Sequence, residues 1–299
     1  MANTILVVGA TGMQGGGVAR HLLKQRTFNI RCMARNPESQ AAKLLRQQGA
    51  EIVQADLDDP VSLRRALHGC NGVFGVTDFW EAYLREYEQG VNLIEAAAES
   101  GVSHLVLSTL PSAKKISHGA IELPHFETKA RMEEHTQRRN IRFTFVHVAF
   151  YYENFLNYFP PRRQVDGGYT ISFPLGDACL GALAVEDVGG VVAEMFEDSA
   201  EFVNKTIEII GDEMPAQDYA EAMSRVLKRE ITYTHVSRET YASMGFPGAR
   251  ELADMFEFLR VYTPSRRAHI IQCRQLLPEM QTFEAWLERN ANKFASVVA

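Results

Sequence analysis

The first half of the chain alternates short apolar runs with longer amphipathic segments. The runs are rich in β-branched side chains and end at glycine, proline or polar residues, which is typical of buried strands. The predicted strands cover residues 5–8, 30–33, 51–54, 73–76, 105–107 and 143–148. The predicted helices between them cover residues 15–24, 40–48, 61–67, 86–100 and 126–138. Apolar strands separated by helices predict a parallel sheet covered on both faces, an α/β doubly wound Rossmann fold.

This regular alternation weakens after about Ala149, where turn signals at 159–161 and 166–169 flank an aromatic-rich stretch. We expect a Rossmann domain over residues 1–150 and, over 151–299, mainly a smaller mixed α/β lobe. A helix at 188–196 and a strand at 206–210 are expected to return to the first sheet as part of residues 185–212. The C-terminal lobe is expected to contain elements at 216–227, 231–235, 249–262 and 283–294.

A glycine-rich motif follows the first strand and opens the first helix. Its residues are Gly9, Ala10, Thr11, Gly12, Met13, Gln14 and Gly15. Such glycines allow a tight turn and a close backbone approach to a pyrophosphate, whose charge faces the positive end of the helix. The alternative is a glycine-rich turn that binds nothing.

The exit of the second strand predicts which dinucleotide binds. No acidic residue stands there to accept ribose hydroxyls, and Arg35 follows Gly15 by 20 positions (35 − 15). A guanidinium at that place favours the extra phosphate of NADP. Arg31, Asn36 and Lys43 are alternatives that could share this role, and Arg35 could also be a solvated residue before a turn.

Polar residues also follow the third and fourth strands. Asp56 and Leu57 come after the third strand and Thr77 after the fourth. This edge is where the adenine and nicotinamide halves of a dinucleotide are expected. Asp56 is explained equally well as a turn or helix-capping residue.

Composition narrows the remaining classes of function. With 46% hydrophobic and 23% charged residues the chain fits a globular protein, and its net charge of −6 argues against direct binding of nucleic acid. The four cysteines form no CxxC pair, so neither a metal site nor a thioredoxin-like site is expected. The apolar run at the N-terminus is too short for a signal peptide or membrane span. We therefore expect a cytoplasmic protein without a membrane partner.

The sequence resembles the NmrA-like family, an atypical branch of the short-chain dehydrogenase superfamily, over nearly its whole length. The supporting segments are residues 9–15, 34–37, 54–56, 125–129, 151–155, 245–250 and 282–287. The resemblance implies a Rossmann lobe with a small C-terminal lobe, NADP(H) as cofactor, a regulatory protein partner and a homodimer as a compatible state. Between Trp80 and Gly90 the chain is two residues shorter than similar family members, so Glu88 and Gln89 receive no role.

The same resemblance implies contacts to the cofactor at positions that match the family. These are Arg35, Asn36, Asp56, Lys129, Tyr151 and Asn154.

The catalytic pattern of the superfamily is incomplete in this chain. Active members use a tyrosine, a lysine four residues later and a serine, whereas here His125 precedes Lys129 and Ser108 and Thr109 end the fifth strand. We expect Lys129 to disfavour protonation of His125 because both lie on one helix face. Ser108, His125 and Lys129 are the catalytic candidates. The alternative for His125 is a residue that faces solvent or caps the turn after Pro124.

Two classes of function follow. The first is an NADP(H)-binding redox sensor that regulates a partner protein, with little or no dehydrogenase activity because His125 replaces the tyrosine. Corepression of transcription is a variant of it that adds the nucleus as a location. The second is an NADPH-dependent reductase of quinones or similar electron-poor acceptors. Segments 153–163 and 249–260 are candidate partner surfaces. The second contains a set of residues with the spacing of a buried stripe, namely Leu252, Met255, Phe256 and Leu259.

Overall fold

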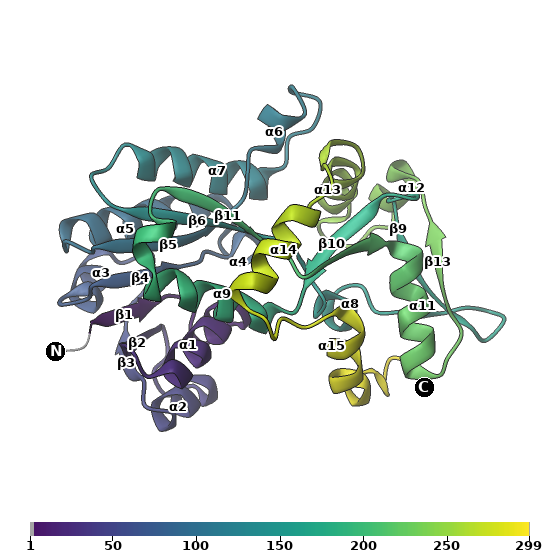
Figure 1. Cartoon of the computed structure of the whole chain (residues 1–299). Coiled ribbons are helices and arrows are strands. Elements are labelled where there is room, and N and C mark those ends of the chain that lie inside the picture. Colours follow the sequence, from purple (N-terminus) through teal and green to yellow (C-terminus); the bar gives the residue numbers. More distant parts are fainter. Residues whose placement is uncertain (1–2, 299) are drawn as a thin grey trace. The chain divides into compact units, whose positions relative to one another are not determined.

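The chain divides into two compact units in a computed structural model that describes residues 3–298 (Figure 1). The first unit consists of residues 3–111, 125–148 and 185–209. The second consists of residues 112–124, 149–184 and 210–298. Each unit is therefore assembled from separate stretches of the chain.

A seven-stranded sheet forms the centre of the first unit. Its strands, in spatial order, are β11 (Lys205–Ile209), β6 (Phe143–Val148), β5 (His104–Thr109), β4 (Gly72–Gly75), β1 (Thr4–Val7), β2 (Asn29–Ala34) and β3 (Glu51–Gln54). Every neighbouring pair is parallel. The strand order reverses between β1 and β4, which confirms the predicted doubly wound fold, and in such folds ligands bind at this reversal.

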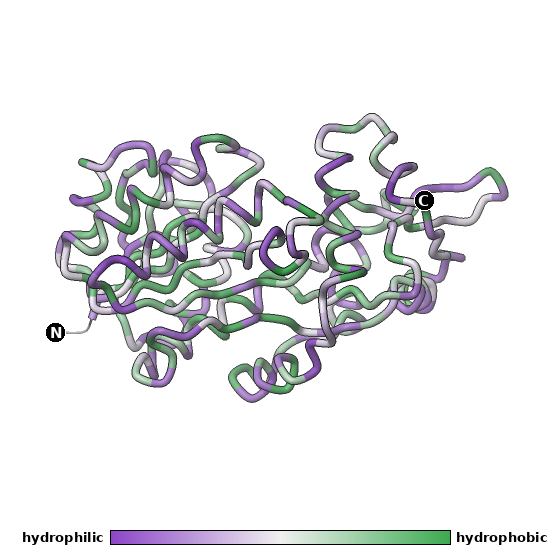
Figure 2. Tube along the Cα trace, turned by 90° about the horizontal axis from the view of Figure 1, so that it is seen from above, coloured by the Kyte–Doolittle hydropathy of each residue, from purple (hydrophilic) through white to green (hydrophobic). Residues whose placement is uncertain are grey.

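Helices cover both faces of this sheet. They are α1 (Met13–Gln25), α2 (Gln40–Gln47), α3 (Pro60–Leu67), α4 (Phe79–Ala82), the 3₁₀ turn η1 (Tyr83–Arg85), α5 (Glu86–Glu99), α7 (Pro124–Gln137), α9 (Val185–Glu197) and α10 (Ser199–Phe202). Leu6 and Val8 of the first strand region pack in one core with Leu63 of α3, Ile94 of α5 and Met132 of α7. Figure 2 shows hydrophobic and hydrophilic residues alternating along the helical turns, as amphipathic helices require.

Glycines bring α1 and α9 unusually close together. A Cβ atom added to Gly189 would lie 2.3 Å from the carbonyl oxygen of Gly17, so the two backbones touch where side chains are absent. Arg20 of α1 forms an ion pair with Glu186 of α9 beside this contact. Residues 185–197, far along the chain, thus complete the first unit.

The second unit contains two three-stranded sheets and a separate core. One sheet has the order β12 (Asp212–Pro215), β10 (Cys179–Leu183), β7 (Phe150–Tyr151), and the other β13 (Ile231–His235), β9 (Tyr169–Phe173), β8 (Arg162–Arg163). Its helices are α6 (Ala113–Ile116), α8 (Asn154–Asn157), α11 (Ala216–Leu227), α12 (Arg238–Ala242), α13 (Ala249–Tyr262), α14 (Arg267–Leu276) and α15 (Phe283–Asn290), followed by the 3₁₀ turn η2 (Ala291–Phe294). This mixed α/β content agrees with the predicted fold class.

The strands and helices predicted in the first half are present with small shifts at their ends, and the structure adds the short α4, η1 and α6 there. In the second half, the sequence pattern did not predict β7, β8, β9, β10, β12, α8, α10, α12 or α14. The local pattern is weak in two of these, since Gly181 lies inside β10 and two acidic residues begin β12. In α13, Leu252, Met255, Phe256 and Leu259 pack into the second core, so this stripe is buried rather than a free docking surface. Within residues 3–298 no helix combines the length and apolarity that a membrane span needs.

Candidate functional site

The loop between β1 and α1 requires glycine at specific positions. Gly9 has φ of +68°, a left-handed conformation, and its carbonyl accepts a 2.9 Å hydrogen bond from the amide of Gly12. A Cβ atom at Gly15 would lie 2.5 Å from the Gly9 carbonyl oxygen. The predicted motif therefore folds as a tight strand-to-helix turn.

The amino end of α1 is suited to an anion. Gly12 is its N-cap and supplies no side-chain acceptor, and the first turn contains no acidic residue. Uncapped amides and the helix dipole favour negative charge at such an end. Thr11, Gly12 and Met13 are exposed at this place, whereas Ala10 and Gln14 are buried.

Arg35 lies immediately after β2, at the same carboxyl edge of the sheet, and its side chain is 65% exposed. Its guanidinium forms an ion pair with Glu81 of α4, and this hydrogen bond raises the pKa of Arg35. Asn36 is exposed, and its Oδ1 atom accepts a hydrogen bond from the amide of Glu38 at 3.0 Å. The site thus offers an accessible, permanently charged donor.

The two alternative basic residues have other partners. Arg31 donates to Glu51 at 2.8 Å and to the carbonyl of Ala66 at 2.8 Å, and its side chain is largely buried. Lys43 lies 3.4 Å from Glu38 in an exposed ion pair. Among these cations, Arg35 is the one that lies directly at the end of β2.

Asp56 and Leu57 form the turn after β3. The Oδ1 atom of Asp56 accepts a 3.0 Å hydrogen bond from the amide of Asp58, which is the turn role that the sequence left open. The carbonyl of Leu57 accepts a bond from Asn92 at 2.9 Å. Asp58 in turn pairs with Arg85, so the segment that follows β4 reaches this turn.

Thr77, Glu86 and Lys129 form a buried polar cluster beyond β4. The Nζ atom of Lys129 donates to Glu86 Oε1 at 2.7 Å, to Thr77 Oγ1 at 3.0 Å and to the Thr77 carbonyl at 3.1 Å. Thr77 and Thr128 also donate to the Glu86 carboxylate, at 2.9 and 2.5 Å. Because an ammonium group has three hydrogens, internal acceptors engage every donor of Lys129.

His125 lies four residues before Lys129 on α7 and is only 6% exposed, so the alternative of a solvent-facing histidine is wrong. The rings of Phe79, Trp80 and Phe126 surround it at centroid distances of 5.7, 5.4 and 5.0 Å. Neither ring nitrogen has a hydrogen-bond partner within the described chain. Burial, with a smaller effect of Lys129, lowers the pKa of His125 to about 4, which confirms the predicted disfavoured protonation.

The end of β5 provides a further polar pair. Ser108 and Thr109 are both buried there. Thr109 donates to Glu133 at 2.6 Å, and the same carboxylate oxygen lies 2.6 Å from the Nε2 atom of His147. Thr109 is therefore held by α7, and Ser108 stands beside it at the strand's carboxyl end.

Tyr151 and Asn154, the two predicted contacts from the later part of the chain, lie in the second unit. Tyr151 ends β7 and pairs in register with Leu183 of β10. Asn154 begins α8, and its carbonyl accepts bonds from the amides of Tyr158 at 3.0 Å and Phe159 at 2.8 Å. Their contact with the first unit stays a prediction.

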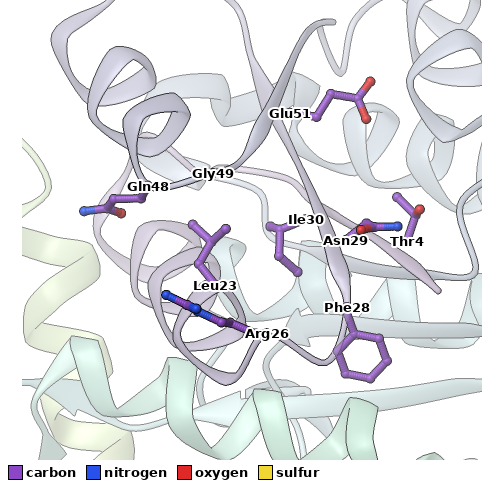
Figure 3. Close-up of a pocket in the computed structure, with 9 residues that line it drawn as sticks. All are labelled: Thr4, Leu23, Arg26, Phe28, Asn29, Ile30, Gln48, Gly49 and Glu51. Carbon is purple, nitrogen blue, oxygen red and sulfur yellow. The ribbon is translucent and has the colours of Figure 1, made fainter. Parts of the chain in front are cut away.

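A surface hollow lies at the opposite edge of the sheet (Figure 3). It includes Thr4, Asn29 and Glu51, the first residues of β1, β2 and β3. None of the predicted site residues lines it. The hollow is thus separate from the carboxyl edge, where the glycine loop and Arg35 lie.

Sequence reasoning did not identify Glu81 and Glu86. Both lie in residues 78–89, the connection from β4 into α5, where the shortened chain left roles unassigned. Nothing in the local pattern distinguishes a fully buried Glu86 from a solvated glutamate at a helix start, because its partner Lys129 is 43 residues away.

In the described part of the chain, no three His, Cys, Asp or Glu side chains are grouped as metal ligands.

Comparison with known sequences gives consistent results. The model of the NmrA-like family matches residues 1–287. An NmrA-like family domain-containing protein of Dictyostelium discoideum is 29% identical over 252 residues, covering 81% of this chain and 83% of that one. The NmrA-like family domain-containing oxidoreductase himF of Aspergillus japonicus is 31% identical over 272 residues, covering 85% and 82%.

Solved structures share the fold. The negative transcriptional regulator NmrA in complex with NADP has a TM-score of 0.83 at 20% identity, covering 96% of this chain and 95% of that one. The NADPH-dependent quinone oxidoreductase QOR2 of Escherichia coli, complexed with NADPH, has a TM-score of 0.79 at 22% identity, covering 95% and 99%. Fold, motif and family match agree, and the chain belongs to the NmrA-like family.

Proposed function

We propose that this protein binds NADP(H) and acts as a redox sensor for a partner protein, with little or no dehydrogenase turnover. The glycine loop with its uncapped helix end fits a pyrophosphate, and Arg35 fits the phosphate that distinguishes NADP from NAD. The structures of NmrA with NADP and with NAD and of QOR2 with NADPH support a nicotinamide dinucleotide by likeness of fold, and Arg35 is the reason to propose NADP(H). When bound, the nicotinamide supplies or accepts a hydride.

The residues that hold the cofactor under this proposal follow the carboxyl edge of the sheet. They are Gly9, Ala10, Thr11, Gly12, Met13, Gln14 and Gly15 around the pyrophosphate, Arg35 and Asn36 at the adenosine phosphate, and Asp56, Leu57, Thr77, Lys129, Tyr151 and Asn154 along the remaining length. A hydrogen bond from Lys129 to a ribose requires one of its three internal bonds to be exchanged.

The state of His125 and Lys129 is the observation that favours a sensor over a dehydrogenase. A ring with a pKa of about 4 is neutral at pH 7, so His125 has no proton to release as an imidazolium. The ammonium group of Lys129 binds Glu86 and Thr77, and no catalytic tyrosine stands four residues before it. The position of the superfamily's catalytic tyrosine is therefore held by a side chain that is poorly suited to act as a general acid.

Sensing follows if the cofactor changes the population of two surface conformations. A ligand shifts such an equilibrium only through its different affinity for the two states. Residues 78–89 connect the Arg35 region with the Lys129 cluster through Glu81 and Glu86 and carry exposed Trp80 and Tyr83, so we place the responsive surface there.

The test combines binding with turnover. NADPH, NADP⁺ and NADH are titrated into the protein by calorimetry, and NADPH oxidation is followed at 340 nm with and without a quinone. Binding of NADP(H) with no acceptor-dependent oxidation supports the sensor. Steady oxidation that requires the quinone contradicts it.

A second candidate function is an NADPH-dependent reductase of quinones or similar acceptors. Curated relatives in several fungi are named oxidoreductases, which favours this alternative. The aromatic surroundings of His125 also suit a flat acceptor, since Trp80 is 57% exposed. The neutral imidazole has one N–H, and because both ring nitrogens are buried, its donation to a quinone oxygen requires the rings around it to move. A His125→Phe variant that loses acceptor-dependent oxidation while retaining NADPH affinity would assign the donor to His125.

A further inference from the structure

Arg35 has an acidic partner in the place where NADP needs a free guanidinium. Glu81 binds the Nη1 atom of Arg35, and the two side chains are 54% and 65% exposed, so neither is buried by the pairing. The nearby carboxylates of Asp56 and Asp58 add weaker attraction to the same guanidinium. Three carboxylates therefore lie near the proposed phosphate site, and one of them, Glu81, already binds the guanidinium that the phosphate would use.

Glu81 is held at this position by its own helix. Asp78 caps α4, and its Oδ1 atom accepts hydrogen bonds from the amides of Trp80 at 2.9 Å and Glu81 at 3.2 Å. Phe79, on the same turn, is buried against His125. Because the cap holds the Glu81 amide and Phe79 anchors the same turn, the Glu81 carboxylate stays within reach of Arg35.

The chemistry of the two cofactors makes this contact selective. The 2′-phosphate of NADP(H) binds through the guanidinium, whose Nη1 atom Glu81 already occupies, and it meets the negative charge of that carboxylate, whereas NAD(H) has only a ribose hydroxyl at that position. We propose that Glu81 is a specificity-determining residue, an internal competitor that weakens NADP(H) binding but not NAD(H) binding. This inference rests on the proposed NADP(H) binding and adds the residue that regulates it.

One consequence concerns the surface beside Glu81. When the phosphate takes Arg35, Glu81 loses its partner and α4 loses one of its attachments to the β2 end. Trp80 adjoins Glu81 and is 57% exposed, so its environment changes with the occupancy of Arg35. Occupancy of the phosphate site is in this way linked to residues 78–89.

Calorimetry with Glu81→Gln tests the competition. NADPH, NADH, adenosine 2′,5′-bisphosphate and 5′-AMP are titrated into the wild-type protein, the variant and Glu99→Gln. Glu99 is a matched control because its exposed ion pair with Arg64 lies outside the site. We expect Glu81→Gln to tighten NADPH and the bisphosphate about 2- to 5-fold, the range of an exposed ion pair, with NADH, 5′-AMP and the control unchanged.

A double-mutant cycle with Arg35→Gln assigns the effect to the pair. In that background only the direct repulsion between Glu81 and the phosphate remains, so Glu81→Gln should tighten NADPH by a smaller factor than it does in the wild-type protein. Unchanged NADPH affinity in Glu81→Gln, or an equal gain for NADH, overturns the inference while leaving NADP(H) binding intact. Wild-type protein that binds neither NADPH nor the bisphosphate overturns the proposed function as well.

Tryptophan fluorescence provides a readout of the linked surface. NADPH absorbs light in the range of tryptophan emission and would quench it directly. Adenosine 2′,5′-bisphosphate does not absorb there, so it is the probe. We expect it to change the emission of the wild-type protein, and the change to disappear in Trp80→Phe, which retains Trp286. A change of equal size in Trp80→Phe contradicts the link to α4.

Discussion

Individual side chains decide what the carboxyl edge of the sheet can do. Lys129 is present at the position that the superfamily pattern requires, but its ammonium group is bound by Glu86 and Thr77. His125 is present where a tyrosine would stand, but burial holds it neutral. Residue identity alone makes both residues catalytic candidates, whereas the partners of Lys129 and the burial of His125 argue against a catalytic role.

The Glu86–Lys129 ion pair gives a prediction about stability. Glu86 is fully buried and the Lys129 side chain is 12% exposed, so Glu86→Gln leaves an ammonium group without a counter-charge. We expect the free energy of unfolding to fall by about 3 kcal/mol in urea denaturation.

The exposed pair of Glu201 and Lys205 provides the control, since Glu201→Gln should cost under about 1 kcal/mol. A double variant, Glu86→Gln with Lys129→Met, should recover part of the loss because no buried charge remains. Equal small effects for Glu86→Gln and Glu201→Gln would contradict the buried pair.

His125 gives a prediction about pH. Its pKa is about 4 in the folded protein and about 6.5 in the unfolded chain, so the unfolded state binds more protons between these values. The stability from neutral His125 is complete above pH 6.5 and decreases as the pH falls toward 4, by about 2 kcal/mol at pH 5. Urea denaturation at pH 7 and pH 5 should show a smaller pH dependence in His125→Phe, and an identical dependence would be evidence against a buried neutral ring.

At the scale of elements, the strand-to-helix connections of the first unit were predictable because each has a local cause. Gly9 and Gly15 are required by a left-handed φ and a close contact, and apolar runs mark β1, β4 and β6. In the second unit, β10 and β12 depend on pairing with each other rather than on their own residues. The position of Glu86 likewise depends on a distant partner, so no local pattern could reveal it.

The close contact of α1 and α9 gives a prediction at this scale. Gly189→Ala would place a Cβ atom 2.3 Å from the carbonyl oxygen of Gly17, so the helices must separate. We expect a loss of roughly 1–3 kcal/mol in unfolding free energy, as overpacking causes elsewhere. Gly168→Ala is the control, since its Cβ atom would meet nothing nearer than 3.4 Å, and equal effects of the two variants would refute the contact.

At the scale of the whole molecule, neither unit is one continuous stretch of chain. The first unit takes α9 and β11 from residues that follow β7 and β10 of the second. The boundary expected near residue 150 coincides with one change of units, between residues 148 and 149. Residues 112–124 already belong to the second unit and the chain later returns to the sheet, so one cut cannot isolate either unit. Residues 245–250, which carry part of the family likeness, lie within the second unit.

A fragment of residues 1–150 tests this organisation. It lacks α9, so the glycine face of α1 loses its cover, and it lacks β11, the neighbour of β6. We expect the fragment to unfold without a cooperative transition, as followed by circular dichroism, whereas the full chain unfolds cooperatively. A fragment with the melting temperature of the full chain would show that α9 and β11 are dispensable.

Selective recognition of a phosphate by Arg35 is the central claim, and one titration measures it directly. NADPH and NADH are titrated by calorimetry into the wild-type protein and into Arg35→Glu. We predict that the substitution weakens NADPH about 10- to 100-fold, as the loss of charged hydrogen bonds implies, and leaves NADH unchanged or tighter because a carboxylate there can accept a ribose hydroxyl. Equal losses for both cofactors, or no heat with NADPH in the folded wild-type protein, would contradict the claim.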